Sequence, residues 1–413
     1  MKGFNAITRF GRNRIGNLKD CLKGNPLNLI TLGSMTLDHD DVKLAKEWLK
    51  NRSHWMDEGV VSEYESEFAR WNGSNYVFAF MGGRVALSAC VHALGLKPGD
   101  EVILPGYTCV VVPNALHYAG IRAVFCDIEL ETFGLDIDQV KNKITSKTRA
   151  ILLHHLYGLV SRDYDAILDL AKCSGLLIIE DCAQSTGAEY RGRKVGNWGD
   201  ISFYSSEQSK VFNTIQGGIA VTNEERFAKR LREYYAQAPS PEEDWVEKQL
   251  SNVILNYYQF KHPQRWWLGD IVNMVYGDKR LVSTTLDEEK GICPPHYGRK
   301  MPPPIAVLGL NQLKKIDRYN EQRRKIAKRW DRWCEENGYR KPFIKADSIP
   351  VYLRYPVLVE PGMKRDRSWA EKELGVELGV WFVSHIHPVP CYLEGFPQAD
   401  EAVKRCINFP CLT

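Results

Sequence analysis

The sequence lacks the paired cysteines of a disulfide framework or a zinc site. Its 11 cysteines are an odd number, and none of them belongs to a C-x-x-C pair. It has no stretch of about 18 apolar residues that would cross a bilayer, and residues 1–20 lack the uninterrupted apolar core of a secretory signal. These absences predict a protein of a reducing cytoplasm that holds no metal ion.

An excess of charge of one sign is also missing. The chain has 55 basic and 51 acidic side chains, and its formal net charge of +4 is too small to predict a nucleic-acid partner, although it suits anionic phosphate ligands. Hydrophobic residues make up 44% and charged residues 26%, which are values typical of a globular protein. A length of 413 residues predicts two or three domains.

Short apolar runs alternate with helical stretches between residues 76 and 222, in a rhythm typical of a layered α/β sheet. Several of the runs are apolar on both faces, as in a parallel sheet that helices cover on both sides. Seven strands are predicted, at Tyr76–Phe80, Glu101–Leu104, Arg122–Cys126, Ala150–His154, Leu177–Glu180, Asp200–Tyr204 and Ile219–Thr222. Before them we expect one helix from its N-cap Asp38 to Lys50 and another from Ser62 to Trp71.

The pattern changes after the predicted sheet. Trp266 and Trp267 lie in a polar, aromatic stretch, where they suit either a membrane surface or, as we favour, packing in a core or a dimer. Helical periodicity resumes from Ile305 to Ile316. The predicted parts are an N-terminal arm (1–35), a large α/β domain (36–235), an insertion or connecting segment (236–300) and a smaller α+β domain (301–413).

The stretch LLIIEDCAQSTGA carries the strongest local signal for chemistry. An apolar strand there delivers Glu180 and Asp181 at its carboxyl end, where open α/β sheets bind their ligands. Asp181 then suits a cation ligand, a general base, or the partner of a protonated heterocycle. A purely structural interpretation, a helix N-cap before Cys182, remains open at this point.

A second stretch, DISFYSSEQSKVFNTIQGG, places Lys210 after another strand. A lysine forms imines when its site favours the neutral amine, and Ser205 and Ser206 just before it offer hydroxyl donors to a phosphate. A lone lysine in a loop is usually an exposed surface residue without a function. Only the neighbouring residues therefore support a catalytic interpretation of Lys210.

The third stretch, FAFMGGRVALSACVHALGL, runs from a strand through Gly82 and Gly83 into an amphipathic helix. Glycine and a helix N-terminus suit an anion, and Arg84 adds a cation. Alone, a Gly-Gly pair is an ordinary turn and is not a dinucleotide fingerprint. Together the three stretches supply a phosphate site, an acid and an amine at one edge of a sheet, which is what pyridoxal 5'-phosphate (PLP) requires.

At these residues the chain resembles the DegT/DnrJ/EryC1/StrS family of sugar aminotransferases, which has the aspartate-aminotransferase fold (PLP fold type I). The resemblance covers about residues 33–235 and 300–345. It rests on the stretches WMDEGVVSEYESEFARWNGSNYVFAF, GRVALSACVHALGLKPGDEVILPGYTCVVVPNAL, HHLYGLVSRDYDAI, IIEDCAQSTGAEYRGRKVGNWGDISFYSSEQSK, QGGIAVTNEE and MPPPIAVLGLNQLKKIDRYNEQR.

The resemblance implies a role for several residues. Lys210 is expected to form the Schiff base with PLP and to act as acid and base, and Asp181 to pair with the pyridine nitrogen. Gln184 is expected at the ring's 3-oxygen, and Gly83, Arg84 and Ser205 at the phosphate. The implied reaction moves an amino group from L-glutamate, through pyridoxamine phosphate, to a nucleotide-linked keto-sugar, for surface polysaccharide or amino-sugar biosynthesis. The resemblance also implies a seven-stranded sheet with an antiparallel strand at Ile219–Thr222, and a homodimer.

Several positions depart from the family pattern. Arg84 replaces a common threonine, and Cys109 stands where an aromatic ring often stacks on the cofactor, so Tyr107 is expected to take that place or to meet the substrate. Gly298 and Lys300 replace an Asn-x-Arg pair whose contact usually serves the partner subunit.

Two histidines and two alternative functions remain to be weighed. His387 is expected to reach the substrate, whereas a histidine in a connection such as His385 is more often structural. One alternative is a PLP-dependent sugar dehydratase, but members of that type have histidine where this chain has Lys210. The other is a catalytically idle regulatory protein that has kept the fold.

Overall fold

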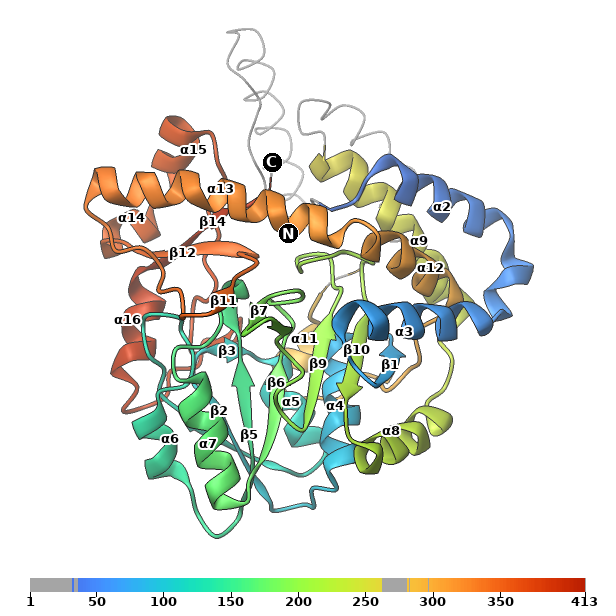
Figure 1. Cartoon of the computed structure of the whole chain (residues 1–413). Coiled ribbons are helices and arrows are strands. Elements are labelled where there is room, and N and C mark those ends of the chain that lie inside the picture. The colour runs from blue at the N-terminus through green and yellow to red at the C-terminus, as the bar shows by residue number, and fades with distance from the viewer. Residues whose placement is uncertain (1–31, 33–35, 262–280, 282, 296, 413) are drawn as a thin grey trace, which may run out of the picture.

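The structure of the protein is a computed structural model, and it describes residues 32, 36–261, 281, 283–295 and 297–412. A seven-stranded sheet lies at its centre (Figure 1). The order of the strands across this sheet is β1 (Tyr76–Phe80), β10 (Gly218–Thr222), β9 (Ile201–Ser205), β6 (Leu177–Asp181), β5 (Thr148–His154), β2 (Glu101–Pro105) and β4 (Arg122–Cys126).

The predicted sheet is confirmed, with strand ends that differ by up to two residues. The pairs β2–β4, β2–β5, β5–β6 and β6–β9 are parallel, and β10 runs antiparallel to both β1 and β9. The antiparallel strand is therefore the one that the resemblance implied. In this arrangement the parallel strands end at one common edge of the sheet.

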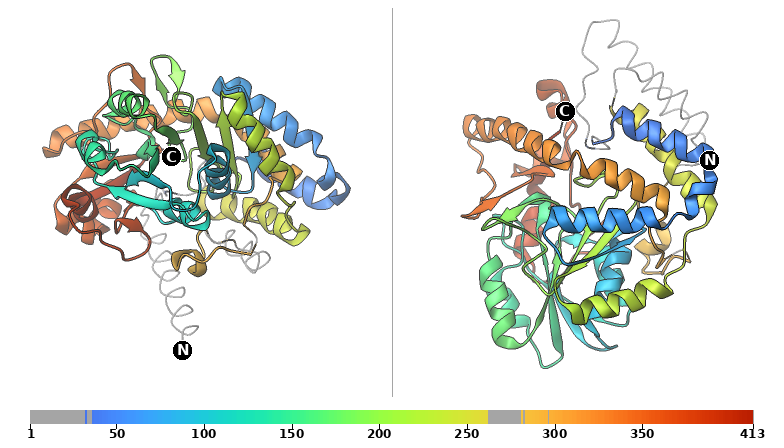
Figure 2. Two further views of the ribbon diagram at one scale, coloured as in Figure 1. Left: turned by 90° about the horizontal axis from the view of Figure 1, so that it is seen from below. Right: turned by 45° about the vertical axis from the view of Figure 1, so that its right-hand side comes forward.

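Helices cover both faces of the sheet, as the doubly apolar strands predicted. Figure 2 shows the layers in two further views. One face packs on α4 (Gly83–Leu94), α5 (Val111–Tyr118) and α8 (Glu225–Gln237). The other packs on α3 (Gly59–Asn72), α7 (Tyr164–Ser174) and α12 (Pro303–Leu313), while α6 (Ile137–Lys143) lies against α7 and β4.

Both helices expected before the sheet are present. The first, α2 (His39–Lys50), follows Asp38, whose N–H donates to the Asp41 carboxylate at 2.8 Å. The second, α3, begins three residues earlier than predicted. The same Asp41 carboxylate accepts hydrogen bonds from Gln312 at 2.9 Å and from Lys315 at 2.6 Å, so it ties α2 to residues of the C-terminal third.

Much of segment 236–300 packs into the large core. Helix α9 (Glu243–Asn256) lies against α2 and α12, and its Leu250, Val253 and Ile254 are buried in the same core as the sheet. The short elements η1 (Arg52–Met56), η3 (Tyr257–Lys261) and α11 (Leu286–Glu289) complete this part. Trp266, Trp267 and nearly all of the expected N-terminal arm lie outside the described residues. Across the described ranges, no helix has the length and apolarity to cross a membrane.

The C-terminal part forms a smaller α+β unit with its own core around Trp330 and Phe409, whose rings stack at 4.4 Å. Its helices are α13 (Ile316–Asn337), α14 (Pro361–Arg365), α15 (Ser368–Leu374) and α16 (Pro397–Arg405), and its sheet pairs β12 (Arg354–Leu358) with β14 (Cys406–Pro410). The minor elements are β3 (Thr108–Cys109), η2 (Leu156–Gly158), β7 (Glu189–Tyr190), β8 (Arg193–Lys194), β11 (Ser348–Ile349) and β13 (Ile386–His387). Because β13 pairs with β3, the C-terminal unit reaches the edge of the large sheet.

Candidate active site

A cavity of about 720 Å³ opens where strands β6 and β9 end. Parallel strands of an open α/β sheet carry their ligand sites at this end. Eight residues predicted for the site line the cavity, namely Gly83, Arg84, Cys109, Asp181, Gln184, Ser205, Lys210 and His387, whereas Tyr107 and Ser206 do not. The fold thus brings together side chains from the three stretches that the sequence singled out.

Asp181 is the last residue of β6 and is almost fully buried. One carboxylate oxygen accepts the backbone N–H of Ala183 at 2.9 Å. Burial raises the pKa of the carboxyl, and the hydrogen bond from Ala183 and the nearby charge of Lys210 oppose this shift. A cationic ligand above Asp181 would stabilise its ionised form, so the residue suits a protonated ring nitrogen.

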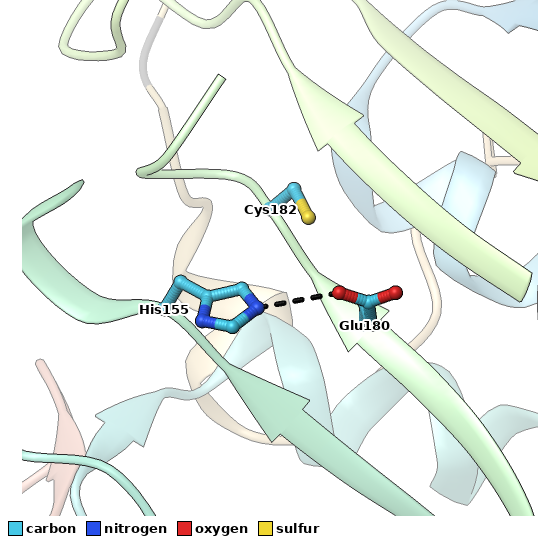
Figure 3. A group of neighbouring side chains, drawn as sticks. All are labelled: His155, Glu180 and Cys182. Atoms are coloured by element: carbon cyan, nitrogen blue, oxygen red, sulfur yellow. Dashed lines mark hydrogen bonds and ion pairs between the residues drawn. The ribbon is translucent and has the colours of Figure 1, made fainter. Parts of the chain in front are cut away.

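The neighbouring Glu180 accepts several hydrogen bonds, and Figure 3 shows the one from His155. Its carboxylate accepts a hydrogen bond from His155 Nε2 at 3.3 Å and another from the Tyr164 hydroxyl. Three backbone N–H groups also donate to it, those of Gly196 at 2.8 Å, Trp198 at 2.8 Å and Gly199 at 2.6 Å. Burial alone would raise the pKa of Glu180, but the hydrogen bonds from His155, Tyr164 and the backbone outweigh it and hold the pKa below its ordinary value.

His155, Glu180 and Cys182 are close enough together to suggest a metal site (Figure 3). The donors already present argue against that interpretation. The Glu180 carboxylate already accepts hydrogen bonds from five donors. The other nitrogen of His155, Nδ1, accepts the backbone N–H of Ser161 at 3.3 Å. The group therefore holds the end of β6 in place and orients His155, which lines the cavity beside Asp181.

Lys210 extends over an indole ring of the C-terminal unit. Its Nζ lies 5.0 Å from the centre of the Trp381 ring, and both residues line the cavity. The Trp381 N–H donates to Asn408 Oδ1 at 2.9 Å, and its carbonyl accepts the hydroxyl groups of Tyr107 and Tyr157. The ring beside the amine is therefore on a firmly held backbone.

At the predicted phosphate site, the backbone at Gly82 and Gly83 packs closely against Ser205 and Gly218. A Cβ at Gly83 would lie 2.8 Å from the Ser205 Cβ, and a Cβ at Gly218 would lie 2.2 Å from the Gly82 carbonyl carbon. Only glycine fits at these two positions. Helix α4 begins at Gly83 without a side-chain cap, so its N-terminal N–H groups are available to an anion.

Arg84 has a partner that the sequence did not reveal. Its guanidinium forms an ion pair with Glu288 and donates to the Ser283 carbonyl, so residues of segment 283–295 form part of the cavity wall. The same wall is held by Tyr297, whose hydroxyl donates to the Arg84 carbonyl at 2.9 Å. Arg84 stands at the predicted place, but its charge is already paired.

Gln184, Cys109 and His387 complete the predicted lining. The amide oxygen of Gln184 accepts the Tyr157 N–H at 2.9 Å, which leaves its amide nitrogen as a donor for a ligand. Burial raises the pKa of the Cys109 thiol. Burial also lowers the pKa of His387 to about 4, with help from the positive charges of Arg354 and Lys210, so its imidazole is neutral at neutral pH.

The expectation that Tyr107 stacks on the cofactor or meets the substrate does not fit its position. Tyr107 is fully buried and does not line the cavity; its hydroxyl is occupied by the backbone of Trp381 and Phe382. It holds the backbone that carries the Trp381 ring beside Lys210. His385 is equally buried and bonds Asp400 at 3.1 Å, as a structural histidine does.

The two positions that depart from the family pattern before Met301 are outside the cavity lining. Gly298 has a positive φ of 85° in a bend, and the backbone of Lys300 forms an isolated antiparallel β-bridge with Phe80. The ammonium of Lys300 lies 4.9 Å from the Tyr235 ring centre.

The cavity residues that sequence reasoning missed include His155, Glu288, Arg354 and Trp381. His155 had a usable signal, because it directly follows the β5 strand in the HHLYG stretch. The other three come from stretches where the resemblance is loose or absent.

The residues present fit PLP. A glycine-lined helix N-terminus with Ser205 suits its phosphate, and buried Asp181 suits its ring nitrogen. Gln184 offers an amide donor, and Lys210 an amine in the same cavity.

Comparison with known proteins gives a consistent result. A model of the DegT/DnrJ/EryC1/StrS aminotransferase family matches residues 36–413. The chain is 36% identical over 375 residues to the GDP-perosamine synthase of Escherichia coli O157:H7, covering 89% of this chain and 87% of that protein.

Two solved structures share the fold. The aminotransferase TlmJ from Streptoalloteichus hindustanus has a TM-score of 0.70 at 22% identity, over 92% of this chain and 93% of that one. The NtdA protein from Bacillus subtilis, solved with bound pyridoxamine phosphate, has a TM-score of 0.67 at 22% identity, over 91% of this chain and 78% of that one.

Proposed function

Because the chain belongs to the DegT/DnrJ/EryC1/StrS family and is a PLP-dependent sugar aminotransferase, we propose that it moves the amino group of L-glutamate to a nucleotide-linked keto-sugar. The product would serve surface polysaccharide or amino-sugar biosynthesis. GDP-linked keto-sugars are the first acceptors to consider, since the relative at 36% identity is named for a GDP-linked amino sugar.

One observation carries this proposal: Lys210, Asp181, Gln184 and Ser205 line one cavity although they come from two strand ends and the loops after them. In a catalytically inactive protein of this fold, the presence of an amine, a buried acid and an anion site in one cavity would have no explanation. A cavity of about 720 Å³ is of the size that holds a cofactor and a small substrate.

Each residue then has a role of its own. Bound PLP supplies an electron sink for the substrate's reacting carbon. Asp181 would keep the ring nitrogen protonated, Gln184 would donate to the ring oxygen, and Ser205 with the start of α4 would hold the phosphate. Lys210 would hold the cofactor through its amine and would move a proton to and from the substrate's reacting carbon.

His387 and Cys109 would face the substrate from the β3–β13 pair. The His387 imidazole is neutral at neutral pH, and its Nδ1 accepts the Val383 N–H at 3.5 Å, so its Nε2–H can donate a hydrogen bond to a sugar hydroxyl.

The test is a screen of GDP-, UDP- and dTDP-linked keto-sugars with L-glutamate as donor. We expect one nucleotide class to yield an amino sugar together with 2-oxoglutarate, with ping-pong kinetics. Failure of every keto-sugar, with intact cofactor absorbance, would contradict the proposed function.

We also propose that the protein is a homodimer, as the resemblance implies, with active sites at the interface. Light scattering that shows a fully active monomer would contradict this.

A further inference from the structure

Lys364 is a buried lysine of the C-terminal unit, and none of the described carboxylates pairs with it. It lies in α14, only 7% of its surface is exposed, and burial lowers the pKa of its ammonium to about 8. Among the ionisable groups near it are Cys406, which favours the charged form, and Arg367, which opposes it. A buried cation without a counter-charge costs stability, so its place in the fold needs an explanation.

Three main-chain carbonyl groups surround the ammonium. Lys364 Nζ donates to the Val403 carbonyl at 2.7 Å, to the Phe382 carbonyl at 3.1 Å and to the Ala402 carbonyl at 3.4 Å. An ammonium has three N–H groups, so each carbonyl can receive one. Ala402 and Val403 belong to the last turn of α16, where the helix dipole favours a positive charge. Phe382 belongs to neither a helix nor a strand, so side chains must fix its backbone.

The Phe382 carbonyl is one of four backbone groups that fix Trp381 and Phe382. The Trp381 N–H donates to Asn408 Oδ1 at 2.9 Å. The Tyr107 hydroxyl donates to the Trp381 carbonyl at 3.0 Å and accepts the Phe382 N–H at 2.7 Å. Neutral side chains thus hold three of the four groups, and Lys364 holds the fourth. With all four groups bonded, this short backbone is held in one conformation.

Trp381 and Phe382 both line the cavity beside the reactive amine. The Trp381 ring centre lies 5.0 Å from Lys210 Nζ. The Phe382 ring centre lies 5.3 Å from that of His387, another residue of the cavity wall. A misplacement of about 1 Å, caused by a change far from the chemistry, can lower a rate by roughly a hundredfold. The hydrogen bond from Lys364 is therefore placed to affect the reaction.

From these contacts we propose that Lys364 is a positioning residue, which fixes the backbone of Trp381 and Phe382 so that the indole ring stays beside Lys210. Lys364 itself does not line the cavity. The role rests on the proposed aminotransferase function, because its effect is on the reaction at Lys210. It also explains the buried charge, since three N–H groups on one flexible stem hold together three carbonyls that an apolar side chain would leave unbonded.

Two variants of Lys364 and one of a second residue test this role. Lys364→Met removes the charge and all three donors at nearly the same length. Lys364→Gln is a milder change, because its amide keeps two N–H donors on a shorter stem. Tyr107→Phe removes the two hydrogen bonds that hold the same backbone from the other side.

Lys345→Met is the matched control. Lys345 is also largely buried, and its Nζ donates to the Arg162 carbonyl at 2.9 Å and pairs with Asp165 at 3.0 Å. It does not line the cavity. Its replacement therefore measures what the loss of a buried lysine costs where no active-site backbone depends on it.

Two measurements are made on the PLP-loaded proteins, at a temperature at which far-UV circular dichroism shows them folded. The first is the visible circular dichroism band of the bound cofactor, which reports how the neighbouring groups are oriented. The second is the half-reaction with L-glutamate, followed by the change in cofactor absorbance over a range of L-glutamate concentrations.

We expect Lys364→Met to weaken the circular dichroism band and to lower the maximal rate about tenfold, less than the roughly hundredfold cost of a 1 Å misplacement. The L-glutamate concentration for half-maximal rate should change less than about threefold, because Lys364 contacts no substrate. Lys364→Gln should cause smaller losses of both. Tyr107→Phe should act in the same direction, and the double variant should lose less than the product of the single losses, because both changes free one backbone. Lys345→Met should keep the wild-type band and rate.

A folded Lys364→Met protein with the wild-type band and maximal rate would overturn the proposal, since Lys364 would then only stabilise the C-terminal unit. A change confined to the half-maximal L-glutamate concentration would overturn it too, by making Lys364 part of donor binding. If Lys364→Met does not fold, Lys364→Gln decides, and wild-type values in both measurements contradict the role. Failure of the proposed function is distinguishable, because the wild-type cofactor would then not respond to L-glutamate while the band still reports the position of its neighbours.

Discussion

Replacing Glu180 with glutamine tests whether a carboxylate hub, and not a metal ion, holds the end of strand β6. The carboxylate accepts five donors, three of them backbone N–H groups. An amide keeps one oxygen and replaces the other with an NH₂ group. The Tyr164 hydroxyl can reverse its role, but a backbone N–H such as that of Gly196 cannot. At least one buried donor therefore loses its acceptor.

The expected cost follows from these bonds. A buried donor without a partner costs about 1–3 kcal/mol, and the remaining bonds lose the strength that the negative charge gave them. We expect Glu180→Gln to lower the free energy of unfolding by about 3 kcal/mol. Urea unfolding followed by far-UV circular dichroism measures this, with Glu321→Gln as the control, because that exposed glutamate only pairs with Lys325 on the same helix.

Cys182 separates the two interpretations of the cluster. If the hub is only hydrogen-bonded, Cys182→Ala removes a small buried group and costs about 1 kcal/mol, and a chelator leaves the wild type unchanged. A loss from Cys182→Ala as large as that from Glu180→Gln, together with destabilisation by the chelator, would refute the reasoning in favour of a metal site. So would a Glu180→Gln protein as stable as the wild type.

Three further outcomes are expected. Asp181→Asn should keep the cofactor absorbance but lose turnover by roughly a hundredfold, because an amide does not stabilise a protonated ring nitrogen as an anion does; near-normal steady-state rates would mean that another acid has this role. Burial lowers the pKa of His154 to about 4 from its ordinary 6.5. The unfolded chain therefore takes up a proton between these values that the folded chain refuses, and stability should fall by up to about 3 kcal/mol as the pH drops from 6.5 to 4. Unfolding at several pH values checks this, and His154→Gln should flatten the dependence. Gly83→Ala should weaken PLP binding about tenfold in a fluorescence titration, since the new methyl group displaces Ser205; Gly362→Ala, which has open space around it, should not.

The central sheet and the residues at its edge were predictable from local pattern. The sequence shows where each apolar run ends. Because β6 and β9 are parallel, the residues that follow the two runs, Asp181 and Ser205, must lie at one edge of the sheet. Neither step needs any knowledge of tertiary contacts.

The rest of the site depends on contacts between distant parts of the chain. Arg354 meets Trp381 across 27 positions of sequence, and Arg84 meets Glu288 across 204. No periodicity marks either pair. Tyr107 was misplaced for a related reason: the two-residue strand β3 begins only after it, so its nearness in sequence to Cys109 did not carry over to the cavity.

The most direct test of the account is to find the lysine that carries the cofactor. The PLP-loaded enzyme is reduced with borohydride, digested, and its labelled peptide is sequenced by mass spectrometry. The account predicts a single pyridoxyl label on Lys210 and none in a folded Lys210→Ala variant that still binds PLP. A label on any other lysine, or no label in the wild type, would contradict it.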